Sequence, residues 1–186
     1  MFTRRAKHRG FTLIELVLFI AVVGAGVAGT LLVYDYSSRS SADPIVRKQA
    51  LAIAESLLEE IQQMPFTYCD PDDPAVSTAT SSAGCTVAEA IGPEAGETRY
   101  SATTPFDNAN DYHNYNTAIE VPAGMKDISG AVIPGLSGYN AAVTVVQSSL
   151  NGIPASDSLL ITVTVTGPAG VTVVVDGYRI QYAPNL

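Results

Sequence analysis

The chain has 186 residues, of which 47% are hydrophobic and 15% charged, and its formal net charge is −8. This acidic balance disfavours nonspecific binding to nucleic acid or to anionic membrane surfaces, because both require clustered positive charge. The length beyond the N-terminal apolar segment, roughly 150 residues, is enough for one small domain with its own core.

The N-terminus combines a basic leader with a long apolar segment. Four basic residues stand in the first ten positions: Arg4, Arg5, Lys7 and Arg9. From Leu16 to Tyr34 the chain contains no charged residue. As a helix, residues 11–34 would measure about 36 Å, enough to cross a bilayer core of about 30 Å. The positive flank predicts a cytoplasmic N-terminus, with the rest of the chain on the other side of the membrane.

One carboxylate, Glu15, lies inside this apolar segment. A charge is costly in lipid and usually marks a functional position. An ordinary secretory signal has an apolar core of about 7–15 residues, followed by its cleavage site. Here the core is longer and the small residue, Gly10, precedes it. The alternative interpretation is a plain membrane anchor with a stray glutamate near the interface.

Residues 10–16, GFTLIEL, resemble the class III signal of type IV prepilins and of type II secretion pseudopilins. The resemblance implies that prepilin peptidase cleaves after Gly10 and that the new amine of Phe11 is methylated. It also implies that subunits polymerise through the helix that Phe11 begins. In this family Glu15 would set the axial register by pairing with the Phe11 amine of a neighbouring subunit, because ion pairs are stronger at low dielectric.

A second, amphipathic helix is predicted to begin after residues 35–43, a polar segment that indicates a break. Asp43 and Pro44 are typical of a helix N-cap followed by proline at the first helical position. Apolar residues then recur at intervals of three and four, which predicts one buried stripe. The stripe consists of Ala50, Ile53, Ala54, Leu57, Leu58, Ile61 and Met64, and Pro65 ends the helix.

Three glutamates toward the end of this helix, Glu55, Glu59 and Glu60, oppose the helix macrodipole. No basic residue lies four positions away to compensate them. They are either solvated surface charges or the acidic end of a contact with the basic end of another subunit.

Residues 66–99 are predicted to form a loop region that includes a tract rich in Ser, Thr and Ala. Cys69 and Cys85 bracket this tract, and in an exported segment they predict a disulfide. A spacing of 16 residues would contribute about 3 kcal/mol by the loop-entropy model. The alternatives are a metal pair or two free thiols, and neither has supporting histidines. A short helical turn is expected over residues 86–90.

The phrase FDNANDYHNY, residues 106–115, is rich in side-chain oxygens. Asp107, Asn108, Asn110 and Asp111 offer the ligands that calcium uses, but their spacing does not match an EF-hand loop. Asx turns and helix caps are therefore the first interpretation and calcium the second. No other cofactor is expected. Together with residues 41–44 and 176–179, the phrase also resembles one minor-pilin group, the biogenesis protein D branch of mannose-sensitive haemagglutinin pili.

The C-terminal third predicts an antiparallel sheet, because it is rich in Val, Ile, Thr and Tyr. Strands are expected over residues 139–147, 158–166 and 171–182, with a turn at 167–170. Residues 161, 163 and 165 should face the core while the intervening threonines face outward. Shorter strands are expected at residues 100–104 and 119–121.

The order of elements predicts an α+β, pilin-like fold in which a long N-terminal helix packs on a C-terminal antiparallel sheet. The predicted parts are the leader (1–10), the transmembrane and polymerisation helix (11–34), the polar break and amphipathic helix (35–65), the disulfide-tied loop (66–99) and the sheet (100–186).

The sequence predicts a structural subunit with no catalytic residues, because it contains no recognisable catalytic motif. The expected function is that of a minor pilin in a type IV pilus; the alternatives are a type II secretion pseudopilin or an adhesive or DNA-uptake minor pilin. Expected partners are other pilin subunits, prepilin peptidase and the assembly platform of the inner membrane, but not nucleic acid. We expect a single-pass protein of the bacterial inner membrane with a periplasmic C-terminal domain, which becomes extracellular in the pilus.

Overall fold

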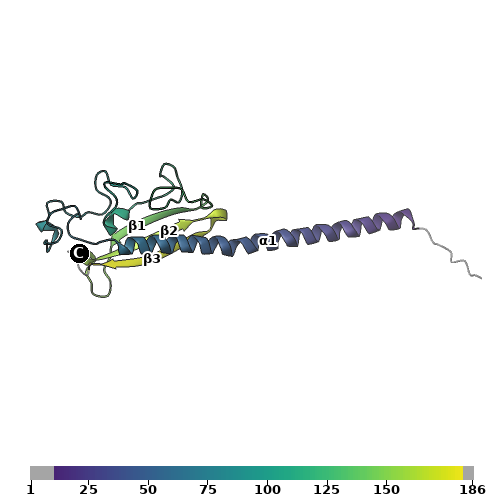
Figure 1. Ribbon diagram of the computed structural model, residues 1–186. Coiled ribbons are helices and arrows are strands. Elements are labelled where there is room, and N and C mark those ends of the chain that lie inside the picture. Colours follow the sequence, from purple (N-terminus) through teal and green to yellow (C-terminus); the bar gives the residue numbers. More distant parts are fainter. Residues whose placement is uncertain (1–10, 182–186) are drawn as a thin grey trace, which may run out of the picture. The chain divides into compact units, whose positions relative to one another are not determined.

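A computed structural model describes residues 11–181, without the side chains of residues 38–43. The expected leader, including Gly10, and the expected strand residue Tyr182 lie outside that range. The elements are α1 (Leu13–Gln63), β1 (Asn140–Gln147), β2 (Ser158–Thr166) and β3 (Thr172–Ile180), shown in Figure 1, and four short 3₁₀ helices. These are η1 (Ser82–Gly84), η2 (Ala109–Tyr112), η3 (Ala155–Asp157) and η4 (Pro168–Gly170). The chain divides into two compact units, Met1–Pro44 and Ile45–Leu186.

Helix α1 continues through the polar segment at which the sequence predicts a break. Residues 35–43 have helical backbone and Pro44 lies inside the helix, so the predicted break and the N-cap at Asp43 are wrong. Serine, arginine and aspartate each lower helix stability by at most about 0.7 kcal/mol relative to alanine, which a long flanking helix tolerates. Proline removes one helical hydrogen bond while the neighbouring turns keep theirs. The boundary between the two compact units nevertheless falls directly after Pro44.

The three strands form an antiparallel meander in the order β1-β2-β3. In the register, Ile161 of β2 lies opposite Val145 of β1 and Gly177 of β3. The predicted alternation along β2 is confirmed, because Ile161, Val163 and Val165 are fully buried while the threonines between them are not. The predicted turn between β2 and β3 is also present; it contains η4.

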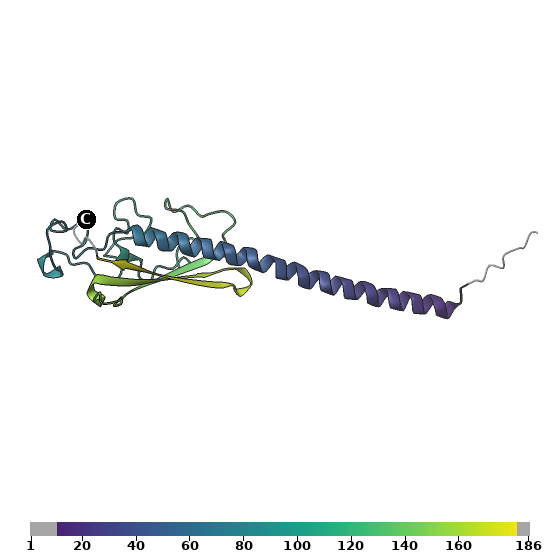
Figure 2. The ribbon, with the colours of Figure 1, turned by 90° about the horizontal axis from the view of Figure 1, so that it is seen from below.

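The part of α1 that follows Ile45 covers one face of the sheet (Figure 2). Its predicted stripe is confirmed. Ala50, Ala54, Leu57, Leu58 and Ile61 are buried, and Ile53 and Met64 pack at the edge of the same core. Helix and strand lie close together at Gly177, where a Cβ atom would lie 2.9 Å from Leu58 Cδ1 and 2.5 Å from Gln62 Nε2. Only glycine fits this contact without displacing a neighbour. The molecule therefore has the expected α+β, pilin-like fold.

The two short strands expected before residue 140 are absent. Residues 98–104 close a tight loop, in which Thr98 N donates a hydrogen bond to Thr104 O at 3.3 Å. Residues 119–121 follow a turn, and Val121 is 94% exposed. The edge of β1 is instead covered by residues 114–117, whose backbone bonds to Val143 and Ala141 in an irregular ladder. The sequence did not predict that residues 114–117 would pair with β1, because this segment is polar and has no strand-like alternation.

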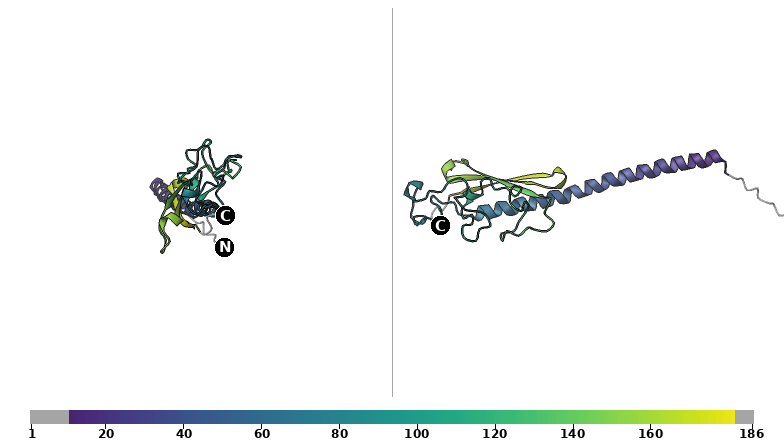
Figure 3. Two further views of the ribbon diagram at one scale, coloured as in Figure 1. Left: turned by 90° about the vertical axis from the view of Figure 1, so that its left-hand side faces the viewer. Right: turned by 90° about the horizontal axis from the view of Figure 1, so that it is seen from above.

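The loop that follows α1 lies beyond the C-terminal end of the helix (Figure 3). It contains the predicted disulfide between Cys69 and Cys85. The helical turn expected at residues 86–90 is absent, because Ala88 forms an isolated antiparallel bridge with Cys69. Two backbone hydrogen bonds flank this bridge, Asp70 N to Val87 O at 3.2 Å and Glu89 N to Tyr68 O at 3.0 Å. The chain on both sides of the disulfide is thus held in a short ribbon.

Candidate functional site

Phe11, which precedes α1, and Glu15 in its first turn line the same surface recess. The helix begins directly after Thr12. The carbonyl oxygen and Oγ1 of Thr12 accept hydrogen bonds from Glu15 N at 3.1 and 3.4 Å. This is how an N-capping threonine satisfies the unpaired amides of a first turn. Phe11 is 84% exposed, and it borders one surface recess together with Glu15, Leu16 and Phe19. Phe11 and Glu15, four residues apart in the sequence, therefore border the same recess.

The helix behind them is apolar on every side. Leu13–Ser37 has a mean hydropathy of 2.6, and none of it is buried within the structure. A helix that is hydrophobic all round requires lipid or other apolar helices around it. Gly24, Gly26 and Gly29 have open space where a Cβ would stand, so a neighbouring helix can approach closely there. The segment fits a single-pass membrane anchor.

The four oxygen-rich residues of the phrase 106–115 surround η2 but do not converge on one point. Asp111 Oδ2 accepts hydrogen bonds from the backbone N of Asp107 at 2.9 Å and of Asn108 at 2.7 Å, which are contacts of the capping type. Asn108 Nδ2 donates to Thr67 Oγ1 at 2.9 Å. Asp107, Asn108, Asn110 and Asp111 nevertheless each retain one buried Oδ1 without a hydrogen-bond partner.

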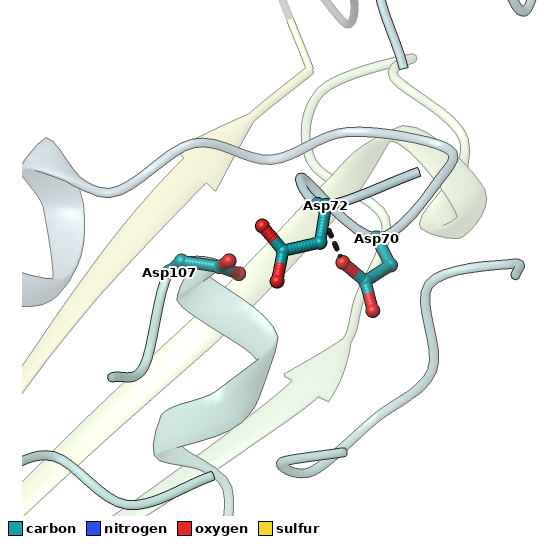
Figure 4. A group of neighbouring side chains, drawn as sticks. All are labelled: Asp70, Asp72 and Asp107. Atoms are coloured by element: carbon teal, nitrogen blue, oxygen red, sulfur yellow. Dashed lines mark hydrogen bonds between the residues drawn. The ribbon is translucent and has the colours of Figure 1, made fainter. Parts of the chain in front are cut away.

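The structure distributes these residues over a larger group of carboxylates. Asp107 lies with Asp70 and Asp72, and the Asp72 carboxylate points toward Asp107 in Figure 4. Asp72 N also donates to Asp70 Oδ1 at 2.7 Å. A second group comprises Asp70, Glu94 and Glu97, and a third comprises Glu89, Glu94 and Asp111. Within each group, one oxygen of every carboxylate lies within 4.8 Å of the others.

We call these seven side chains the acidic cluster; they are Asp70, Asp72, Glu89, Glu94, Glu97, Asp107 and Asp111. Among residues 11–181, neither recorded ion pair includes a member of the cluster, since Arg99 pairs with Glu60 and Lys126 with Glu120. The sequence indicated the aspartates, but nothing in its spacing predicted that Glu89 and Glu94 would join Asp111, because the loop after α1 has no regular structure.

Burial and mutual crowding of the carboxylates change the acidity of the cluster. Burial, with the charges of Glu94, Asp111 and Asp70 around it, raises the pKa of Glu89 to about 9. Burial also raises the pKa of Asp111 to about 6, although two backbone hydrogen bonds oppose the change. The pKa of Glu97 is likewise raised to about 7, first by burial and then by Glu94. Each of these carboxylates is therefore destabilised in its charged form.

The sequence did not predict a second buried polar group, the ion pair between Arg99 and Glu60. Arg99 Nε and Nη2 donate to the two oxygens of Glu60 at 2.7 and 2.6 Å, and Tyr112 Oη donates to Glu60 Oε1 at 2.7 Å. Glu60 therefore has a partner within its own chain, while Glu55 and Glu59 are exposed. Sequence could not reveal this pair, because 39 residues separate its members.

One comparison with known proteins bears on this geometry. Residues 5–31 match the family described as the prokaryotic N-terminal methylation motif, which spans the basic flank, the Phe11–Glu15 turn and most of the apolar helix. No curated protein and no solved structure matched the chain. The match supports a precursor of the type IV pilin or pseudopilin kind, a class of structural proteins. It implies processing by prepilin peptidase and assembly with other pilin subunits.

Proposed function

We propose that the chain is a minor pilin, a structural subunit that enters a type IV pilus by packing its N-terminal helix against those of other subunits. The observation that carries the proposal is Glu15, an exposed carboxylate one turn from Phe11 on a helix with no other charge before Asp35. In lipid such a carboxylate is costly unless it meets a cation. Cleavage after Gly10 releases that cation, the amine of Phe11.

The ion pair would form between subunits. In the monomer, Glu15 would lie near the membrane edge, where its carboxylate can reach the aqueous interface. In a filament, the Phe11 amine of the next subunit would face Glu15 in a dry helix bundle, where Coulomb attraction is stronger than in water. This contact would set the axial register. Gly24, Gly26 and Gly29 would let the helices approach closely enough to form it.

The basic leader supports an orientation in which the N-terminus is cytoplasmic and the Ile45–Leu186 unit is periplasmic before assembly. In this proposal the chain is not an enzyme; it works through the assembly platform of the inner membrane and becomes extracellular in the pilus. The resemblance of residues 106–115 and 176–179 supports assignment to the biogenesis protein D branch of mannose-sensitive haemagglutinin pili.

The proposal is tested by comparing Glu15→Val with wild type in a piliated host. Mass spectrometry of both mature chains should show the same N-terminus, a methylated Phe11, because the peptidase recognises the boundary before the helix. The variant should be depleted from sheared filaments at least tenfold. An amine left buried and unpaired costs about 3–5 kcal/mol, and about 1.4 kcal/mol already corresponds to a tenfold change.

Glu55→Gln is the matched control, since it removes an exposed carboxylate from the other half of α1 and should enter filaments normally. Equal incorporation of Glu15→Val and wild type would contradict the register role. A mature N-terminus other than Phe11 would contradict the pilin assignment itself. If wild-type protein is absent from sheared pili but its deletion blocks export of a secreted protein, the chain is a pseudopilin.

A further inference from the structure

The exposed face of α1 in the Ile45–Leu186 unit carries opposite charges at its two ends. Arg47 and Lys48 stand near the start of this part of the helix, and Glu55 and Glu59 stand nearer its end. All four residues are exposed. Residues at intervals of three, four, seven and eleven lie along one side of a helix. We call this side the outer stripe; it comprises Lys48, Leu51, Ala52, Glu55 and Glu59.

The charges of the outer stripe have no counter-charge in their own chain. Neither ion pair recorded among residues 11–181 includes one of them. Glu55 and Glu59 stand four residues apart, where like charges on a helix repel each other. Glu59 also lies near the carboxyl end of α1, where the helix dipole disfavours negative charge. The stability of the single chain therefore does not account for this arrangement, whereas cations from a second chain would offset both effects.

The middle of the outer stripe is apolar. Leu51 is 39% exposed, and Ala52 beside it is small and also exposed. Burial of Leu51 against a second helix would remove apolar surface from water, which is favourable. The distance between two packed helices depends on the side chains at the contact, so a small residue allows a close approach. An apolar centre flanked by charges is the pattern of a helix–helix contact.

The order of the charges determines how a second copy can pack. Copies inserted into one membrane have the same orientation, so their helices run parallel. In register, Lys48 would face Lys48 and Glu55 would face Glu55, and both contacts are repulsive. Displacement of one copy by seven residues, about 10.5 Å along the axis, brings its Lys48 to Glu55 of the other. Displacement by eleven residues, about 16.5 Å, brings Lys48 to Glu59 on the same side of the helix.

We propose that the outer stripe binds a second copy of this chain, parallel and displaced along the helix, through ion pairs of Lys48 with Glu55 and Glu59 of the other copy. The contact leaves the basic end of one copy and the acidic end of the other free, so it can repeat and does not close at a dimer. The inference rests on the proposed function, in which the helices of subunits pack side by side. In the Phe11–Glu15 pair the cation also precedes the carboxylate, so both contacts require displacement in the same sense.

Carbodiimide crosslinking of sheared filaments tests the contact, because this reagent joins a carboxylate directly to an amine. Two full-length forms are expressed together in a piliated host. One carries Lys48→Arg and keeps both glutamates, and the other carries Glu55→Gln/Glu59→Gln and keeps Lys48. A link between Lys48 and either glutamate can then form only between two copies. Peptide mapping by mass spectrometry should find this link.

The outcomes separate this inference from the proposed function. Filaments that contain both forms but no such link would overturn the inference and leave the proposed function intact. Absence of both forms from the filaments would overturn the proposed function and the inference with it.

Charge reversal tests whether ion pairs drive the contact. As the only copy in the host, Lys48→Glu should lower the amount in sheared filaments about threefold, because repulsion replaces an exposed attraction. Lys48→Glu/Glu55→Lys should recover most of this loss, since a displacement of seven residues again joins opposite charges. Glu55→Gln should still enter filaments normally, because Glu59 remains available to Lys48.

Asp176→Lys is the matched control for these variants, since it reverses one exposed charge on β3, away from the helix. It should enter filaments like wild type. Equal incorporation of Lys48→Glu and wild type, an equal loss in Asp176→Lys, or no recovery in the exchanged variant would each overturn the ion pairs and mean that the outer stripe is solvated surface charge.

Discussion

Arg99 keeps its charge in a nearly enclosed position because Glu60 binds it through two hydrogen bonds. The Arg99 side chain is 8% exposed and that of Glu60 is 27% exposed. Burial alone would raise the pKa of Glu60, but the hydrogen bonds from Arg99 and Tyr112 outweigh it and lower that pKa. The pair ties α1 to the loop that follows it. A buried pair of this kind is strongly destabilising when only one partner is removed.

We therefore expect Glu60→Gln to lower the free energy of unfolding by about 3 kcal/mol, because the Arg99 guanidinium would remain buried without a counter-charge. Chemical denaturation of the detergent-solubilised chain measures the loss. Glu59→Gln, one position along the same helix but exposed, should change stability by less than about 0.5 kcal/mol. Equal effects of the two substitutions would mean that the ion pair contributes nothing beyond surface charge.

Single residues were predictable where a local period determined their environment, and unpredictable where a distant partner did. The inward positions of β2 follow from alternation and those of α1 from a spacing of three and four. The partners of Glu60 and of Asp111 come from segments without a period, so their positions depend on how the loops fold. Asn110 is the clearest example, since its sequence neighbours indicate a turn but not a buried side chain beside Glu89.

At the scale of elements, the strands with dense β-branched composition were predicted to within about two residues at each end. The errors lie where an element depends on its surroundings. The helix runs through Pro44 although its local residues indicate a cap, and the chain at residues 98–104 folds back on itself although it contains strand-forming residues. At both places the outcome depends on the surrounding structure, which the local sequence does not show.

The disulfide region permits a prediction at this scale. Cys85→Ser should lower stability by about 3 kcal/mol by releasing the loop in the unfolded state. It should also expose the tract at residues 75–83 to proteases. The variant changes the less buried partner, whereas Cys69 is fully buried and its substitution would add a packing defect. Limited proteolysis with mass mapping checks the result. Cleavage of the reduced wild type at the same sites is the control, and an intact tract in the variant would contradict the expectation.

At the scale of the whole molecule, we expect from the acidic cluster that the free energy of unfolding, measured with a metal chelator present, falls as pH rises from 5 to 8. The folded pKa is raised for Glu89 to about 9, for Glu97 to about 7 and for Asp111 to about 6, above the values near 4 expected in the unfolded chain. Between those values the native state binds more protons than the unfolded state. The slope of the unfolding free energy with pH is therefore negative.

Glu60 acts in the opposite sense, because its lowered pKa means that its contribution is lost only as pH falls below about 4.5. Stability should therefore be greatest near pH 5. Urea unfolding curves at pH 5, 6.5 and 8 with chelator present measure the trend. Glu89→Gln should flatten it and the exposed control Glu59→Gln should not. A stability that rises steadily toward pH 8 would show that the cluster is not crowded in solution.

The packing of α1 on the meander also determines what happens while the chain is being made. The apolar stripe from Ala50 to Ile61 leaves the ribosome well before its covering strands, which end at Ile180. During that interval the stripe has no partner in its own chain, and pairing helix with sheet requires closure of a long intervening segment. A nascent chain stopped after β2 would therefore remain dependent on chaperones. Completion of β3 is the step that ends this dependence.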